Sequence, residues 1–185
     1  MKPDPSPPAA DAGVSPARRR ALVWTTAGLA AAAGAGAAWY LNGASRVADD
    51  GAALWTQQFD RPDGSPLDLA GLRAGGRLIV NFWATWCPPC VAELPMLDRF
   101  AQTHGANGWR VLGLAVDTPS SVRKFLETRP VAFPIGMAGL QGTELSRALG
   151  NTQGSLPFTV VFAANGSVSH RKIGQLSEND LAGWM

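Results

Sequence analysis

The apolar residues of this chain form one long uninterrupted run and a series of shorter runs. The long run, Ala21 to Leu41, contains no charged residue and shows no polar face. A helix rises about 1.5 Å per residue, so a helix of this length can cross the roughly 30 Å hydrocarbon core of a bilayer. The shorter runs begin near Trp55 and predict a folded domain.

Within residues 55–185, short apolar runs predict strands, and longer stretches with apolar residues at helical spacing predict helices. An Asn165-Gly166 turn joins the last two strands into a hairpin, and Ser177 begins a capping-box sequence. Another short hairpin, Thr56–Phe59 with Pro66–Leu69, is expected around a Pro-Asp-Gly turn. The expected strands are Leu78–Trp83, Arg110–Val116, Phe158–Ala163 and Val168–Ile173, and the expected helices are Pro89–Thr103, Ser120–Glu127, Glu144–Leu149 and one from Ser177. This order predicts an α/β sandwich in which helices cover both faces of a mixed sheet.

The 185 residues divide into a leader (1–20) that we expect to be disordered, the apolar run (21–41), a solvated linker (42–54) and the domain (55–185). Three arginines, Arg18 to Arg20, precede the apolar run, so we expect the N-terminus in the cytoplasm and the domain on the other side of the membrane. The same features fit a twin-arginine or secretory signal, with small residues at Ala35–Ala37 as a cleavage site. We therefore expect a single-pass inner-membrane protein with a periplasmic domain or, after cleavage, a soluble periplasmic protein.

Composition excludes several classes of function. The formal net charge is +2, and the basic residues form no long run and no stripe interleaved with aromatic residues, so we expect no nucleic-acid partner. Two cysteines are too few for a disulfide framework, and a zinc site would need two further ligands. His104 and His170, the only histidines, are interpreted as surface or helix-end residues. We expect neither a metal nor another cofactor.

The two cysteines occur together, in Cys87-Pro88-Pro89-Cys90, directly after the strand Leu78–Trp83. A disulfide across so short a loop stabilises a fold little, which favours reversible dithiol/disulfide exchange over a structural role. Cys87 is expected at the N-terminus of the following helix, where the helix dipole favours a thiolate, and is therefore the predicted nucleophile. Cys90, one turn further along the helix, is predicted to resolve the mixed disulfide.

The two prolines between the cysteines bear on the direction of electron flow. Neither Pro88 nor Pro89 has an N–H group, so neither can donate a hydrogen bond to the Cys87 sulfur. A less stabilised thiolate means a less stabilised reduced form, which favours a reductant over an oxidant. Prolines in a first helical turn are also common for conformational reasons alone.

The run Asn81-Phe82-Trp83-Ala84-Thr85-Trp86-Cys87-Pro88-Pro89-Cys90-Val91-Ala92-Glu93-Leu94-Pro95 resembles the active-site segment of the TlpA group of thioredoxin-like proteins. These are membrane-anchored thiol-disulfide oxidoreductases outside the bacterial cytoplasm, and the resemblance covers roughly residues 55–185. It implies a thioredoxin-like fold with an N-terminal β-hairpin and an insertion in the middle of the domain. It further implies oxidised protein partners such as apocytochrome c or copper-assembly proteins, and a membrane electron donor of the disulfide-relay type.

The resemblance also implies roles for individual residues. Pro95 matches a proline that kinks the active-site helix, and Leu156-Pro157 matches a cis-proline loop that binds the substrate backbone. Trp83 and Trp86 are expected at the apolar rim around the disulfide, although core packing alone would also explain Trp83.

Asn81 stands where thioredoxins usually have a buried Asp, and it cannot act as a base. Glu93, three residues after Cys90 and on the same helix face, is then the candidate proton acceptor. We expect Glu93 near the surface. The alternative to a proton acceptor is a solvated residue that only complements the helix dipole.

Two other functions compete with thiol-disulfide exchange. A copper metallochaperone would bind the metal between Cys87 and Cys90, with Met96 or Met137 as a further ligand. A thiol peroxidase needs a Thr three residues before its reactive cysteine, whereas Thr85 precedes Cys87 by two residues. The Cys-x-x-Cys motif and the expected cis-proline loop favour exchange over both.

Overall fold

The computed structural model describes residues 51–185. The expected leader, the expected anchor or signal, and residues 42–50 of the expected linker lie outside the described residues. Within the described part, no helix combines the length and the apolar character that crossing a membrane requires.

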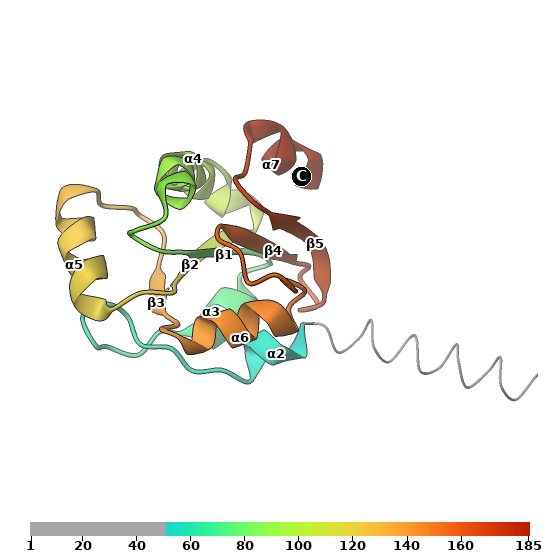
Figure 1. Ribbon diagram of the computed structural model, residues 1–185. Helices are drawn as coiled ribbons and strands as arrows, with labels where there is room; N and C mark the ends of the chain where they lie inside the picture. The colour runs from blue at the N-terminus through green and yellow to red at the C-terminus, as the bar shows by residue number, and fades with distance from the viewer. Residues whose placement is uncertain (1–50) are drawn as a thin grey trace, which may run out of the picture. The chain divides into compact units, whose positions relative to one another are not determined.

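A five-stranded mixed sheet forms the centre of the domain (Figure 1). The strands lie in the order β3-β2-β1-β4-β5, with β1 parallel to β2 and antiparallel to β4. β3 is parallel to β2, and β5 is antiparallel to β4. The bounds are β1 Arg77–Trp83, β2 Trp109–Ala115, β3 Ile135–Met137, β4 Phe158–Phe162 and β5 Val168–Ile173.

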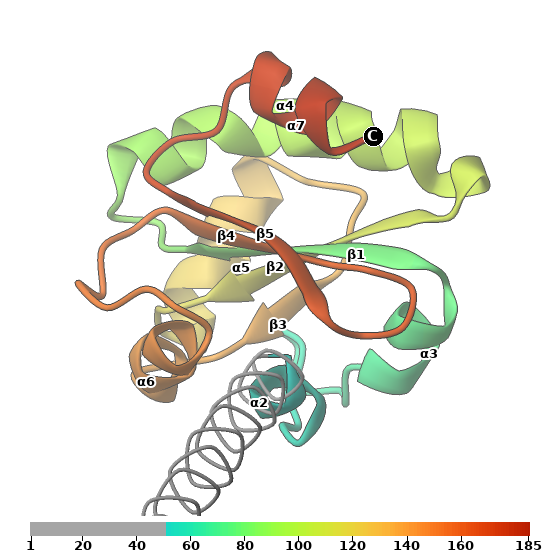
Figure 2. The same cartoon turned by 90° about the vertical axis from the view of Figure 1, so that its right-hand side faces the viewer.

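Helices cover both faces of the sheet (Figure 2). α4 (Pro88–His104) and α7 (Glu178–Trp184) lie on one face, and α2 (Ala52–Trp55), α3 (Leu69–Ala74) and α6 (Gln141–Ala148) lie on the other. α5 (Pro119–Thr128) lies beside the edge of the sheet formed by β3 (Figure 1), and a short 3₁₀ helix, Gly105–Asn107, follows α4. The predicted α/β sandwich is confirmed.

The alternation of side chains along β1 explains why two apolar clusters form. Ile79 and Trp83 belong to the cluster under α4, whereas Leu78, Val80 and Phe82 belong to the cluster on the opposite face. Successive side chains of a strand point to opposite faces, so the odd-numbered residues of β1 point toward α4. Asn81 has an odd number and is fully buried, which puts its amide under the helix that carries the cysteines.

Two expectations for the start of the domain need correction. The predicted hairpin of Thr56–Phe59 with Pro66–Leu69 is reduced to one bridge, between Asp60 and Pro66. Its second arm ends early because the Asp68 carboxylate accepts a hydrogen bond from the N–H of Gly71 (2.8 Å) and caps α3 at Leu69. Leu54, assigned to the linker, lies in α2 and is fully buried, so the fold begins before Trp55.

The segment between β2 and α6 contains α5 and β3, in the position where the resemblance implies an insertion. α5 is confirmed close to its predicted bounds, with Thr118 as its N-cap. β3 is only three residues long and was not predicted. Val122 of α5 is fully buried in the cluster under α4, so this segment packs against the active-site side of the domain.

Candidate active site

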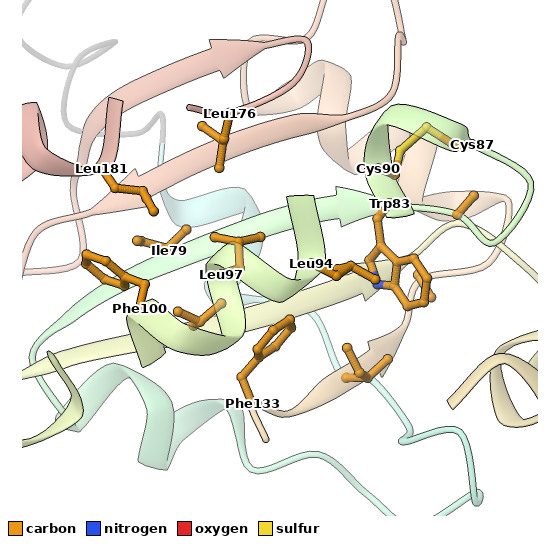
Figure 3. Packing of buried hydrophobic residues seen from close by; sticks show 14 of the residues in the cluster. Ile79, Trp83, Cys87, Cys90, Leu94, Leu97, Phe100, Phe133, Leu176 and Leu181 are labelled. Carbon is orange, nitrogen blue, oxygen red and sulfur yellow. A yellow bond between two sulfur atoms is a disulfide. The ribbon is translucent and has the colours of Figure 1, made fainter. Parts of the chain in front are cut away.

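The redox pair lies where β1 leads into α4. Cys87 is the N-cap residue of α4, with an extended backbone, and it forms a disulfide with Cys90 (Figure 3). Cys87 is 4% exposed and Cys90 is fully buried, so the cysteine that is predicted to resolve the mixed disulfide is the more buried of the two. Both belong to the apolar cluster that contains Trp83 and Leu94.

The prolines shape the first turn of α4. Pro88 and Pro89 are its first two residues, so among the first three residues of the helix only Cys90 has a backbone N–H. The next N–H, that of Val91, donates to the carbonyl of Cys87 (3.1 Å). The helix N-terminus therefore offers the Cys87 sulfur fewer donors than such a terminus usually does. Pro95 lies inside α4, as expected.

The Leu156–Pro157 peptide bond is cis, as the resemblance implied. Pro157 is buried, and it directly precedes β4, whose first residue, Phe158, pairs with Phe82 of β1. Because β1 and β4 are antiparallel, the loop before β4 and the Cys87 loop after β1 lie at the same end of these two strands.

Glu93 lies inside the fold, contrary to the expectation that it lies near the surface. It is 1% exposed. Its Oε1 accepts a hydrogen bond from the Asn81 side-chain amide (2.7 Å), and its Oε2 accepts one from the N–H of Leu176 (2.6 Å). The same Asn81 amide group also donates to Thr159 Oγ1 (3.0 Å). The carboxylate is thus buried and doubly hydrogen-bonded, one helical turn beyond Cys90.

Burial and hydrogen bonding act on Glu93 in opposite directions. Burial raises the pKa of its carboxyl because the charged form is desolvated, and the hydrogen bonds from Leu176 and Asn81 lower it, with a net upward shift. A carboxyl group with a raised pKa is better matched to proton transfer near neutral pH than a solvated one. Glu93 is therefore equipped to exchange a proton at the inner side of the disulfide.

A second carboxylate, Asp117, was not predicted. It follows β2, and its Oδ2 accepts hydrogen bonds from the N–H (2.9 Å) and the Oγ1 hydroxyl (2.6 Å) of Thr85. Burial raises the pKa of Asp117, but the hydrogen bonds that it accepts from Thr85 and Thr118 lower the pKa by more than burial raises it, so the net shift is downward. The ionised Asp117 carboxylate therefore accepts the hydrogen bonds that hold the loop leading to Cys87. An acidic residue directly after a buried strand was the available signal.

The two tryptophans of the site have different environments. Trp86 is 66% exposed, which suits the predicted place at the rim of the site. Trp83 is fully buried, and within residues 51–185 its ring N–H has no hydrogen-bond partner. Trp83 therefore acts as part of the core under the cysteines, next to Phe125 (ring centroids 5.3 Å apart).

The other candidate ligands do not gather at one point. In the described part of the chain, no group of three or more His, Cys, Asp or Glu side chains is placed to hold a metal ion. His104 packs against Phe100 (4.6 Å between rings), and His170 packs against Trp184 (5.9 Å). Met96 and Met137 are partly buried against the cluster that contains the cysteines.

A Cys-x-x-Cys pair at the N-terminus of the helix after a central strand, with a cis-proline loop at the same end of the sheet, defines a thioredoxin-like redox protein. The Redoxin family model matches residues 50–183, so the chain belongs to the Redoxin family. Together with the relatives and solved structures below, this identifies it as a TlpA-like thiol-disulfide oxidoreductase.

Curated relatives and solved structures agree with this assignment. The thiol-disulfide oxidoreductase ResA of Bacillus cereus is 27% identical over 124 residues, which covers 66% of this chain and 69% of the relative. ResA of Geobacillus kaustophilus is 32% identical over 108 residues, which covers 58% and 60%.

A thiol:disulfide interchange protein from Chlorobium tepidum is 33% identical, with a TM-score of 0.58 and coverage of 68% of this chain and 87% of that one. A thioredoxin-related protein from Neisseria meningitidis is also 33% identical, with a TM-score of 0.60 and coverage of 69% and 94%.

Proposed function

We propose that this protein is an exported reductase of protein disulfides, in which Cys87 attacks, Cys90 resolves and Glu93 accepts the Cys90 proton. The observation that carries the proposal is the disulfide at the start of α4 with a buried, hydrogen-bonded carboxylate one turn behind it. The cis Leu156–Pro157 bond lies at the same end of the sheet as the disulfide, which supports substrate binding by Trp86, Leu156 and Pro157.

The cycle begins with the reduced dithiol. The Cys87 thiolate attacks one sulfur of a partner's disulfide, a new S–S bond forms to Cys87, and the partner's other sulfur leaves as a thiolate that takes up a proton. Cys90 then loses its proton to Glu93 and attacks the Cys87 sulfur. The partner leaves with both cysteines reduced, and the enzyme is left with the Cys87–Cys90 disulfide found in the structure.

The first turn of α4 supports the reducing direction. Pro88 and Pro89 supply no N–H to a Cys87 thiolate, so the reduced form is stabilised less than in a strong oxidant. We infer that the protein donates electrons and is reduced again by a dithiol donor in the membrane. Apocytochrome c and copper-assembly proteins are the candidate acceptors, because the resemblance to the TlpA group implies such targets.

The proposed location is the periplasm, with residues 21–41 as a single-pass inner-membrane anchor or as a cleaved signal. Both alternatives place the cysteines outside the cytoplasm, where oxidised protein partners occur.

Trapping of the mixed disulfide tests the proposed function. In Cys90→Ser, the resolving thiol is absent, so Cys87 should remain covalently joined to its partner and release it on treatment with dithiothreitol. The matched control is Cys87→Ser, which should trap nothing. Equal trapping by both variants, or tight copper binding by a wild-type protein that reduces no disulfide, would refute the assignment.

A further inference from the structure

A groove runs from the redox pair along the boundary between the active-site helix α4 and α5. At its redox end it is lined by Thr85, Trp86 and Pro88. It continues into a second hollow, and the residues that line both are Val91 and Pro95 of α4 with Phe125 and Arg129 of α5 and its C-cap. We refer to this surface as the α4–α5 groove. It is separate from the Leu156–Pro157 loop, none of whose residues lines it.

The groove combines an apolar wall with one available positive charge. The guanidinium of Arg129 lies over the Phe125 ring, 5.7 Å from its centroid. Arg129 is exposed, and no carboxylate in residues 51–185 forms an ion pair with it. An Arg held against an aromatic face is preorganised to bind a carboxylate through two parallel hydrogen bonds.

The other charges that line the groove are already engaged. Asp98 accepts hydrogen bonds from the N–H of Ala132 (2.5 Å) and from the side chain of Gln102 (2.8 Å). Arg99 pairs with Glu178 (3.3 Å). Arg129 therefore gives the groove a positive charge, and a negatively charged group on a partner would be electrostatically complementary to it.

The position of the groove indicates what occupies it. It starts beside the helix turn that holds Cys87, and Trp86, 66% exposed, lies at that end. A protein joined to Cys87 through one of its cysteines has chain on both sides of that cysteine. One side can follow the groove, with an apolar side chain against Phe125 and Pro95.

We propose that the α4–α5 groove binds an extended segment next to the reactive cysteine of the disulfide-bonded partner, and that Arg129 selects an acidic residue in that segment. The inference rests on the proposed function, since it concerns the partner attached to Cys87. It adds a charge preference that the redox pair does not itself provide.

Synthetic peptides with one intramolecular disulfide test the preference. Glu, Gln or Lys is placed at each of the positions flanking the attacked cysteine, and kcat and KM are measured for the wild type, Arg129→Glu and Lys124→Glu. Lys124 lies on α5 and is exposed but does not line the groove, so it controls for a general change of charge.

At one or more positions the wild type should show a KM about three to five times lower for the Glu peptide than for the Lys peptide, as expected for one exposed ion pair. Arg129→Glu should reverse this order, Lys124→Glu should keep it, and high salt should reduce it. A preference that is absent, or that Arg129→Glu leaves unchanged, overturns the inference. Neutral hydroxyethyl disulfide separates the two claims: if the wild type reduces neither it nor any peptide, the proposed reductase function fails instead.

Discussion

Replacing Glu93 by Gln removes a proton acceptor from the inner side of the redox pair while keeping the side chain's size. In the wild type, Glu93 accepts hydrogen bonds from two donors, the Asn81 amide and the Leu176 N–H. A Gln side chain can accept at only one of these positions, because its second terminal atom is a donor. The Oδ1 of Asn81 has no partner within residues 51–185, so a rotation of the Asn81 amide gives the new NH₂ group an acceptor.

The effect on folding follows from this geometry. A buried hydrogen bond to a charged group that is lost and not replaced costs about 1.5–3 kcal/mol, and the rotation of Asn81 offsets part of that cost. Burial raises the pKa of Glu93, so its contribution to stability is full below the unfolded-state pKa and is lost as pH rises through the folded-state pKa. Gln does not titrate. The variant should therefore become more stable relative to the wild type as pH rises, which denaturant unfolding at several pH values measures.

The effect on catalysis should be larger. General-base assistance contributes about 10²- to 10⁴-fold, and water can replace part of it, so Glu93→Gln should lose at least about tenfold in the attack of Cys90 on the mixed disulfide. The assay loads thionitrobenzoate onto Cys87 and follows its release by absorbance. Wild-type release should slow as pH falls through the Glu93 pKa, and the variant should lack that step.

Two reference variants make the result interpretable. Cys90→Ser gives the lifetime of a mixed disulfide that cannot be resolved. Glu178→Gln removes an exposed Glu whose one ion pair within residues 51–185 is with Arg99, and this variant should behave as the wild type. If Glu93→Gln releases thionitrobenzoate at the wild-type rate with the wild-type pH profile, the Cys90 proton leaves by another route and Glu93 is a structural residue.

Three further predictions concern the potential, the loop and the location. Equilibration with dithiothreitol or glutathione should give a reduction potential nearer about −270 mV than about −120 mV, and a value near the latter would contradict the reductant assignment. Thr85→Val should lower the unfolding free energy by about 1 kcal/mol, whereas Thr85→Ser, which keeps the hydroxyl, should not. Hydrogen bonding lowers the pKa of Asp117, so the loss of unfolding free energy in Thr85→Val should be full above the unfolded-state pKa and should vanish as pH falls through the folded-state pKa. A loss of unfolding free energy that persists below the folded-state pKa would exclude Asp117 as its source. Alkaline phosphatase fused after Ala52 should be active, and an inactive fusion would rule out export.

The sequence was sufficient where local pattern determines structure. The apolar run of β1, the Asn165-Gly166 turn and the Ser177 capping box involve neighbours in the chain, and all three appear as predicted. The short strand β3 was missed because three residues carry too little pattern, and its pairing with β2 is a tertiary interaction. The hairpin near Asp60 is shorter than its Pro-Asp-Gly turn predicts, because the cap at Asp68 starts α3 at Leu69 and ends the second arm.

The same distinction applies to the site. Cys87, Cys90 and the prolines were located by spacing, and the cis bond at Pro157 by resemblance. The burial of Glu93 depends on the N–H of Leu176, which lies 83 residues further along the chain. The clamp on Thr85 depends on Asp117, 32 residues away. The helical periodicity of α4 does not predict that Glu93 accepts a hydrogen bond from a backbone N–H of the segment before α7.

The pairing of Asn81 with Glu93 explains how the site dispenses with a buried Asp on the central strand. Asn81 Nδ2 and Glu93 Oε1 are 2.7 Å apart, so an Asp at position 81 would bring two carboxyl groups into contact inside the fold. Such a pair cannot be doubly ionised, and one member would keep its proton. With Asn81 as a donor, the strand stabilises the ionised form of Glu93 instead of competing with it for a proton. The buried acid thus lies on the helix instead of the strand, one turn beyond Cys90, on the same element as the thiol whose proton we propose it accepts.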